Sequence, residues 1–202
     1  MNLMLEDIAD ITRGSILTRI KDAKGILFSA FTMQQLSYYN NACDSPGSYN
    51  EVIVNKERIN NLCLAKENDI IVGLASGKAM KVTKQEEGYL ILSNFIRIRI
   101  KELDKCNPDF LCWIFNENID TQRYFASLNQ GTARVSIIPL SFIKCMNIEL
   151  IPIDIQRKIG RIYQLQNNKI KIFLNKEKIK SGIIRKKLLE IYNNQNLEDK
   201  EK

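Results

Sequence analysis

Residues 155–192 read IQRKIGRIYQLQNNKIKIFLNKEKIKSGIIRKKLLEIY, and this stretch decides how the chain is organised. It contains no proline, and its apolar residues recur at steps of three or four, which is the period of one helix face. The pattern predicts an amphipathic helix that begins after Pro152 with Asp154 as its N-cap and is roughly 57 Å long at 1.5 Å per residue. A helix of this length needs a partner to cover its apolar face.

The apolar face of this helix is the predicted interface with a partner helix. Its members are Ile159, Ile162, Tyr163, Ile170, Phe173, Ile184 and Leu188. Gln166 and Glu177 fall where a heptad repeat would place apolar residues, so the pattern favours a helix bundle with a polar layer over a long, uninterrupted two-stranded coiled coil. Gly182 is a candidate bend.

Upstream of the helix, the hydrophobic pattern changes to that of strands. Residues 51–54, 69–72 and 89–100 are rich in Ile, Val and Leu, and the last of these segments ends in FIRIRI, a two-residue alternation. Pro108 opens a second helix, from Phe110 to about Ser127, which a turn near residues 116–118 divides. The fold class is therefore α+β. We expect a mixed domain over residues 1–151, the long helix over 152–196 and a frayed tail over 197–202.

The composition excludes several classes of enzyme. The chain has 202 residues, enough for about one domain, and no histidine. Catalysis by Ser-His-Asp or Cys-His groups and zinc sites of the HExxH type are therefore absent. The five cysteines form no Cys-x-x-Cys pair, so we expect reduced, mostly buried thiols and neither a metal site nor a cofactor. No apolar run is long enough to span a membrane, and we expect a cytoplasmic protein.

The positive charge is concentrated in the helix. Residues 155–202 carry thirteen Lys/Arg and five Asp/Glu, which gives a net charge of +8. Residues 1–154 carry seventeen Lys/Arg and eighteen Asp/Glu, which gives a net charge of −1. The two regions add up to the +7 of the whole chain. If residues 1–154 bind DNA, their cations must lie on one face, because evenly spread cations form no positive surface that binds phosphates.

Two short motifs resemble ligand-binding or catalytic motifs, but an ordinary loop or helix start explains each of them better. Gly73-Leu-Ala-Ser-Gly-Lys78 lacks the spacing and the hydroxyl of a Walker phosphate loop, so an exposed basic loop is the better interpretation. Asn107-Pro-Asp-Phe110 resembles the base-holding tetrapeptide of amino-methyltransferases and the Pro-Asp of a nuclease metal site. No glycine-rich cofactor turn and no Glu-x-Lys strand accompany it, and a helix start is the favoured interpretation.

Three polar segments together form a DNA-reading hypothesis. Amide, hydroxyl and aromatic side chains suit base edges and sugars, and lysine or arginine suits phosphate or guanine. The candidate DNA-binding residues are Tyr38, Tyr39, Asn40 and Asn41, then Ser76, Lys78 and Lys81, and finally Gln130, Thr132 and Arg134 within Asn129-Gln-Gly-Thr-Ala-Arg-Val135. Each segment taken alone is equally well a solvent-exposed loop or turn.

The order of motifs resembles the specificity (S) subunits of type I restriction-modification enzymes. Leu5-Glu-Asp-Ile-Ala-Asp-Ile-Thr-Arg-Gly14 is similar to the start of a target-recognition domain, and Asn68-Asp-Ile-Ile-Val72 to its middle. The most specific order is Asn107 to Phe110, then Gly131-Thr-Ala-Arg134, then Ile148-Glu-Leu-Ile-Pro152 before the helix. The family often has two prolines and a glutamate at this last point, where this chain reads Pro152-Ile-Asp-Ile-Gln156.

This resemblance implies a non-catalytic partner of enzymes. S subunits commonly carry two recognition domains and two antiparallel helices that dock DNA methyltransferase (M) subunits, and this chain has room for one of each. The resemblance therefore implies a half-sized S subunit that forms a homodimer on double-stranded DNA. It reads about three to five base pairs per copy, while methylation, and any cleavage by a restriction (R) subunit, belong to other chains.

Two alternatives remain open from the sequence. In the first, the chain is a scaffold, or a decoy or inhibitor, that binds a methyltransferase through its basic helix without specific DNA readout. In the second, it is a detached recognition domain of a single-chain restriction-methylation enzyme. A steep loss of DNA affinity with salt would favour direct DNA binding over the first alternative.

Overall fold

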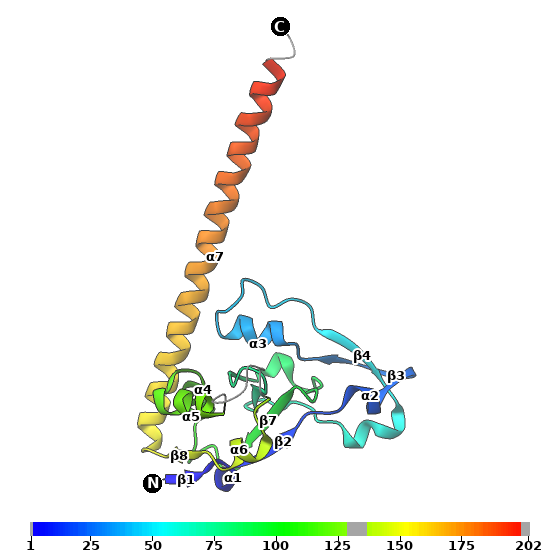
Figure 1. Cartoon of the computed structure of the whole chain (residues 1–202), viewed down its shortest axis with the longest axis vertical. Helices are drawn as coiled ribbons and strands as arrows, with labels where there is room; N and C mark the ends of the chain where they lie inside the picture. Colours follow the sequence, from blue (N-terminus) through cyan, green and yellow to red (C-terminus); the bar gives the residue numbers. More distant parts are fainter. Residues whose placement is uncertain (1, 129–136, 199–202) are drawn as a thin grey trace. The chain divides into compact units, whose positions relative to one another are not determined.

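The computed structural model of the chain describes residues 2–128 and 137–198, with side chains to residue 193 (Figure 1). The chain divides into two compact units, Met1–Gln164 and Leu165–Lys202. The first unit mixes helices and strands, and the second is helical. The predicted fold class, a mixed domain followed by one long C-terminal helix, is confirmed.

A four-stranded antiparallel sheet forms the centre of the first unit. Its order is β2 (Ala9–Arg13), β7 (Phe95–Ile100), β5 (Ile70–Gly73) and β6 (Ala79–Lys81). The FIRIRI alternation of β7 is confirmed, since Ile96 and Ile98 are fully buried. The intervening Arg99 forms two hydrogen bonds of 2.7 Å with the buried carboxylate of Asp69 on the neighbouring segment.

Helices cover one face of this sheet. They are α4 (Pro108–Glu117), α5 (Ile119–Ser127) and α6 (Leu140–Lys144), with α1 (Leu5–Ile8) and a small sheet of β1 (Asn2–Met4) and β8 (Asn147–Glu149) beside them. The predicted division of the second helix is confirmed. The side chain of Asn118 ends α4 and caps α5, because its Oδ1 accepts hydrogen bonds from the amides of Asp120 and Thr121.

The other face of the sheet carries a helix and a ribbon. α3 (Met33–Tyr39) packs there, and β3 (Lys21–Ala30) pairs with β4 (Asn50–Val54) outside the main sheet. Short helices α2 (Leu17–Ile20), η1 (Lys56–Asn61) and η2 (Lys84–Glu86) complete the unit. The predicted strand over residues 89–100 is too long, because residues 89–94 form only isolated bridges, which β7 follows after a turn.

The long helix α7 runs from Ile153 to Glu198 and confirms the predicted helix. It begins two residues earlier than an N-cap at Asp154 predicts, because the carbonyl of Pro152 already accepts hydrogen bonds from the amides of Ile155 and Gln156. Asp154 therefore lies in the first turn and is not the N-cap. The helix is unbroken at Gly182. Among the described residues, no helix is both long and apolar enough to cross a membrane.

Candidate functional site

Two of the three polar segments that the sequence singles out, residues 38–41 and 76–81, meet around β6. The turn after α3 is bound to this strand, because Nδ2 of Asn40 donates to the carbonyl of Ala79 at 3.2 Å. The β5–β6 turn lies next to the residues that flank segment 129–136, since Ala75, Ser76, Leu128 and Ile138 share a small cavity of about 230 Å³. The first two candidate segments therefore lie close together, whereas Gln130, Thr132 and Arg134 lie outside the described residues, and the role of all three segments stays a prediction.

The aromatic segment at the end of α3 is held by internal hydrogen bonds. Nε2 of Gln164 donates to the hydroxyl of Tyr39 at 2.8 Å, and burial raises the pKa of that hydroxyl well above its ordinary value of 10.0. Asn40 donates to the carbonyl of Leu36 as well as to that of Ala79. Asn41 adopts a positive φ of 58° at the end of the helix. Tyr39 and Asn40 therefore serve the fold, and Tyr38 is half-buried beside them.

The two candidate lysines also have internal partners. Lys81 forms an ion pair with Asp109 at 2.6 Å, and the same carboxylate accepts a hydrogen bond from Gln164 at 2.9 Å. Lys78 donates from Nζ to the carbonyl of Asn116 at 2.7 Å. In contrast, Ser76 is exposed at the tip of the β5–β6 turn. Of the candidates on β6 and its turn, only Ser76 has an exposed side chain.

A buried asparagine joins three elements at this strand. Oδ1 of Asn116 in α4 accepts a hydrogen bond from the amide of Ala79 at 2.8 Å, and its Nδ2 donates to the carbonyl of Ala79 and to the hydroxyl of Tyr163. Asn116 thereby completes the hydrogen bonding of β6 and binds α7 at the same time. Because polar groups without partners are costly in a core, this pairing fixes the position of all three elements.

The first three turns of α7 belong to the core of the first unit. Tyr163 is only 4% exposed, and Ile159 is half-buried against the same hydrophobic cluster. We therefore correct the predicted partner face: these two residues pack inside their own unit, because the apolar stripe continues into a segment that the sheet and α4 cover. The sequence pattern alone does not distinguish packing inside a unit from packing against a partner.

Close packing between α7 and α4 depends on Gly160, which the sequence interpretation did not weigh. A Cβ at this position would lie 2.8 Å from Oδ1 of Asn107 and 2.9 Å from the amide of Phe110. The buried Gln156, one turn earlier, accepts a hydrogen bond from the amide of Asn107 at 3.0 Å and donates to the carbonyls of Lys105 and Ile151. A glycine within an amphipathic helix is the signal that could have identified this contact.

Other positions of α7 expose large apolar side chains. Ile162, Phe173, Ile184 and Leu188 are 60–65% exposed, and Ile170 is half-exposed. The first three of these are spaced by eleven residues, which is close to three full helical turns, so they form one row along the helix. A row of this kind is typical of a surface that another chain covers.

The structure supports the predicted helix start at Asn107 to Phe110 and corrects the predicted exposed basic loop at Gly73 to Lys78, because Lys78 is half-buried and bound to the carbonyl of Asn116. Gly73 to Lys78 forms the tight β5–β6 turn, in which the carbonyl of Gly73 accepts hydrogen bonds from the amides of Ser76 and Gly77. Asn107 caps α4 by accepting from the amide of Phe110 at 3.0 Å. In the ranges that the structure describes, no group of three or more His, Cys, Asp or Glu side chains could hold a metal ion.

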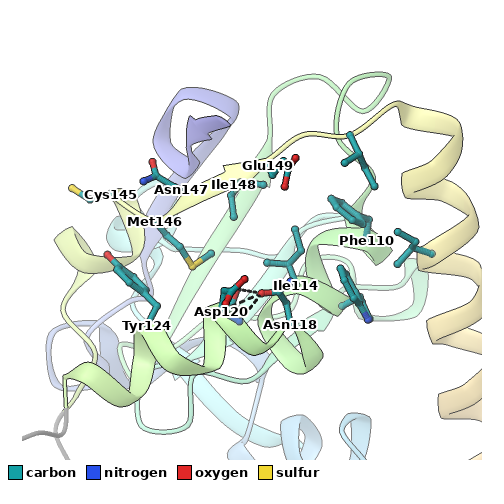
Figure 2. A pocket seen from close by; sticks show the side chains of 14 residues that line it. Phe110, Ile114, Asn118, Asp120, Tyr124, Cys145, Met146, Asn147, Ile148 and Glu149 are labelled. Atoms are coloured by element: carbon teal, nitrogen blue, oxygen red, sulfur yellow. Dashed lines mark hydrogen bonds between the residues drawn. The ribbon is translucent and has the colours of Figure 1, made fainter. Parts of the chain in front are cut away.

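A cavity of about 420 Å³, which the sequence did not predict, lies between the α4–α5 junction and β8 (Figure 2). Its wall combines Met146, Ile148 and Tyr124 with the exposed carboxylates of Asp120 and Glu149. The hydroxyl of Tyr124 donates to the carbonyl of Phe142 at 2.9 Å, and burial raises its pKa.

The cysteines are free, as the sequence predicted. Cys63, Cys106 and Cys112 are buried, and burial raises the pKa of Cys106 to about 12 and the pKa of the other two in the same direction. Because the thiolate is the nucleophilic form, these three thiols are inert at neutral pH.

This arrangement of a mixed domain and a long terminal helix is the fold of type I restriction-modification S subunits. Three solved structures share it. An S subunit from M. genitalium matches with a TM-score of 0.54 and 14% identity over 94% of this chain and 44% of its own. The HsdS subunit from Thermoanaerobacter tengcongensis matches with a TM-score of 0.56 and 14% identity. This match covers 88% of this chain and 39% of the HsdS chain.

A third match comes from a structure that describes complex assembly and conformational transition of the type I R-M system. Its TM-score is 0.61, with 12% identity over 92% of this chain and 43% of that one. Neither a protein-family model nor a curated protein matches the sequence. The chain spans less than half the length of the structures that it resembles.

Proposed function

We propose that the chain is a non-catalytic specificity subunit that directs a type I DNA methyltransferase, and any restriction subunit of the same system, to its DNA target. The observation that carries this proposal is the shared fold over 88–94% of the chain. The lack of histidine and the inert buried thiols agree with a binding role. We also propose that the protein acts in the cytoplasm.

The proposal divides the surface between DNA and partner chains. The β5–β6 turn at Ser76 and segment 129–136, including Gln130, Thr132 and Arg134, read the bases or hold the backbone. Four other candidates stabilise these loops and do not contact DNA, because their polar groups are already bound inside the protein. They are Tyr39, Asn40, Lys78 and Lys81.

Two copies pair through α7 in this proposal. One copy supplies one recognition domain, while the related structures are more than twice as long, so a homodimer restores two domains with two long helices. The exposed row of Ile162, Phe173 and Ile184 provides apolar surface for the contact. The target is then a palindrome of two half-sites separated by a spacer that no side chain contacts.

Purification of the tagged chain from its native cells tests the proposal. We expect a stoichiometric adenine methyltransferase to co-purify, and we expect methylation at one palindromic sequence to disappear from the genome when the gene is deleted. A clean homodimer without a methyltransferase, and an unchanged methylation pattern, would contradict the specificity role. Methylation at asymmetric sites only would contradict the symmetric dimer and leave the specificity role intact.

A further inference from the structure

The ribbon of β3 and β4 ends in a cluster of exposed cations. We define the β3–β4 arm as residues 16–27 and 53–58, which include α2 and the start of η1 beside the ribbon (Figure 1). Its five cations are exposed, and within the described ranges none of them forms an ion pair. They are Arg19, Lys21, Lys24, Lys56 and Arg58.

The arm is the positive part of an otherwise acidic region. It carries five cations and two carboxylates, a net charge of +3, while residues 1–154 together carry −1, so the remainder of that region carries −4. One of the two carboxylates, Asp22, accepts a hydrogen bond from Nδ2 of Asn55 at 2.8 Å and is half-buried. This concentration of charge on one element is what DNA binding by a nearly neutral domain requires.

The local backbone presents these cations away from the hydrophobic core. The register of the ribbon shifts between Lys21 and Ile26, so residues 22–25, with Lys24 among them, lie outside the ladder. Gly25 makes this excursion possible, because a Cβ there would lie 2.0 Å from the carbonyl oxygen of Val54. The buried side chains of Ile20 and Val54 anchor the arm from the inside.

We propose that the β3–β4 arm binds the phosphate backbone of duplex DNA and thereby sets the register in which the reading loops meet their target. This inference rests on the proposed function. Lysine and arginine are the usual phosphate contacts, and a two-stranded ribbon is one of the elements that a DNA major groove admits.

A protein partner fits the arm less well than DNA. Lysine is depleted at the centres of protein–protein interfaces and aromatic residues are enriched there. The arm exposes three lysines, and its exposed apolar residues are aliphatic. They include the cross-strand pair of Leu27 and Ile53, which are 56% and 38% exposed. An apolar pair of this size between cations can lie against sugars or thymine methyl groups.

The salt dependence of binding tests the proposal with the full chain. The substitutions Lys21→Gln, Lys24→Gln and Lys56→Gln are combined in one variant, and affinity for a random duplex is measured by fluorescence anisotropy between 50 and 200 mM NaCl. If each lysine contacts one phosphate, the slope of log K against log salt becomes shallower by about 2.7 in total, at about 0.9 per contact.

The control variant is Lys105→Gln, because Lys105 is exposed but paired with Glu102 at 2.7 Å. It should keep the wild-type slope. An arm variant with the wild-type slope overturns the arm proposal and leaves the proposed function standing. If the arm variant keeps this slope but no longer captures the methyltransferase, the arm is instead a protein-binding surface. If the wild type shows no salt-dependent DNA binding, both the arm proposal and the DNA-reading function are overturned.

Discussion

The substitution Gly160→Ala should destabilise the first unit, although alanine is the better helix former. In the interior of a helix, alanine is favoured over glycine by about 1 kcal/mol. At Gly160, however, the new Cβ would lie 2.8 Å from both Oδ1 of Asn107 and Cβ of Asp109, and 2.9 Å from the amide nitrogen of Phe110. The last of these atoms is backbone, so α4 and α7 must separate.

The magnitude follows from what this separation disturbs. Overpacking costs about 1–3 kcal/mol, and weakening the N-cap of α4 at Asn107 costs about 1 kcal/mol more. After subtraction of the helix propensity, the free energy of unfolding should fall by about 1–3 kcal/mol. Since each kcal/mol shifts Tm by roughly 2–4 °C in a domain of this size, Tm should fall by roughly 2–12 °C.

Urea denaturation followed by the fluorescence of Trp113 measures this change. Trp113 is the single tryptophan of the chain and lies in α4, two turns from the disturbed cap at most. The matched control is Gly182→Ala, because a Cβ at Gly182 meets no atom within 4 Å. The control should leave the Trp113 transition in place and raise helicity in circular dichroism. If Gly160→Ala is as stable as the wild type, the inference that α7 and α4 need a glycine at this contact is refuted.

Three further predictions concern the core, alkaline pH and the outer face of α7. Asn116→Ala leaves the amide of Ala79 without its side-chain partner, while the carbonyl of Ala79 keeps its hydrogen bond from Asn40, so urea denaturation should show a loss of about 1–3 kcal/mol; an unchanged midpoint would refute the role of Asn116 in completing β6. Burial raises the pKa of Cys106 to about 12 and also that of Cys112, both from an ordinary value of 9.0, so above about pH 9 the unfolded state loses protons that the folded state keeps. Stability should therefore fall as pH rises, by up to about 1.4 kcal/mol per pH unit for each thiol, and Cys106→Ala with Cys112→Ala should flatten this profile relative to the wild type; an equal slope would contradict the burial argument. Ile184→Asp should weaken dimerisation at least about tenfold in sedimentation equilibrium, because it places a charge in the apolar contact, whereas Lys178→Gln, with the same change in charge, should not; equal dimerisation constants for both would argue against pairing through this row.

The sequence predicts those parts of the fold in which one periodicity persists. The 3.6-residue period predicts α7, and the two-residue alternation predicts β7. The division of the second helix was also predictable, because Asn118 is a strong cap residue. The strand predicted over residues 89–100 failed in its first half, where apolar composition without alternation does not determine the backbone path.

The sequence selected candidate site residues by type and could not predict which of them have partners inside the protein. Polar and aromatic residue types mark a functional surface and a buried polar network equally well. Tyr39 and Gln164 are 125 positions apart in the chain, and their hydrogen bond is invisible until the fold brings them together. The arm was overlooked for a related reason: its charge of +3 disappears in the net −1 of residues 1–154.

Residues with buried partners are required by the fold, whereas exposed residues without such partners are free to vary. Lys81, Asn116 and Tyr39 hold α3, α4 and β6 together, so under the proposed function changes there alter the shape of the reading surface before they alter any contact with DNA. The exposed turn at Ala75 and Ser76, together with the cations of the β3–β4 arm, can change without loss of a buried partner. We therefore expect a change of DNA target to be achieved at these exposed positions, whereas substitution of the buried network loses binding through loss of stability.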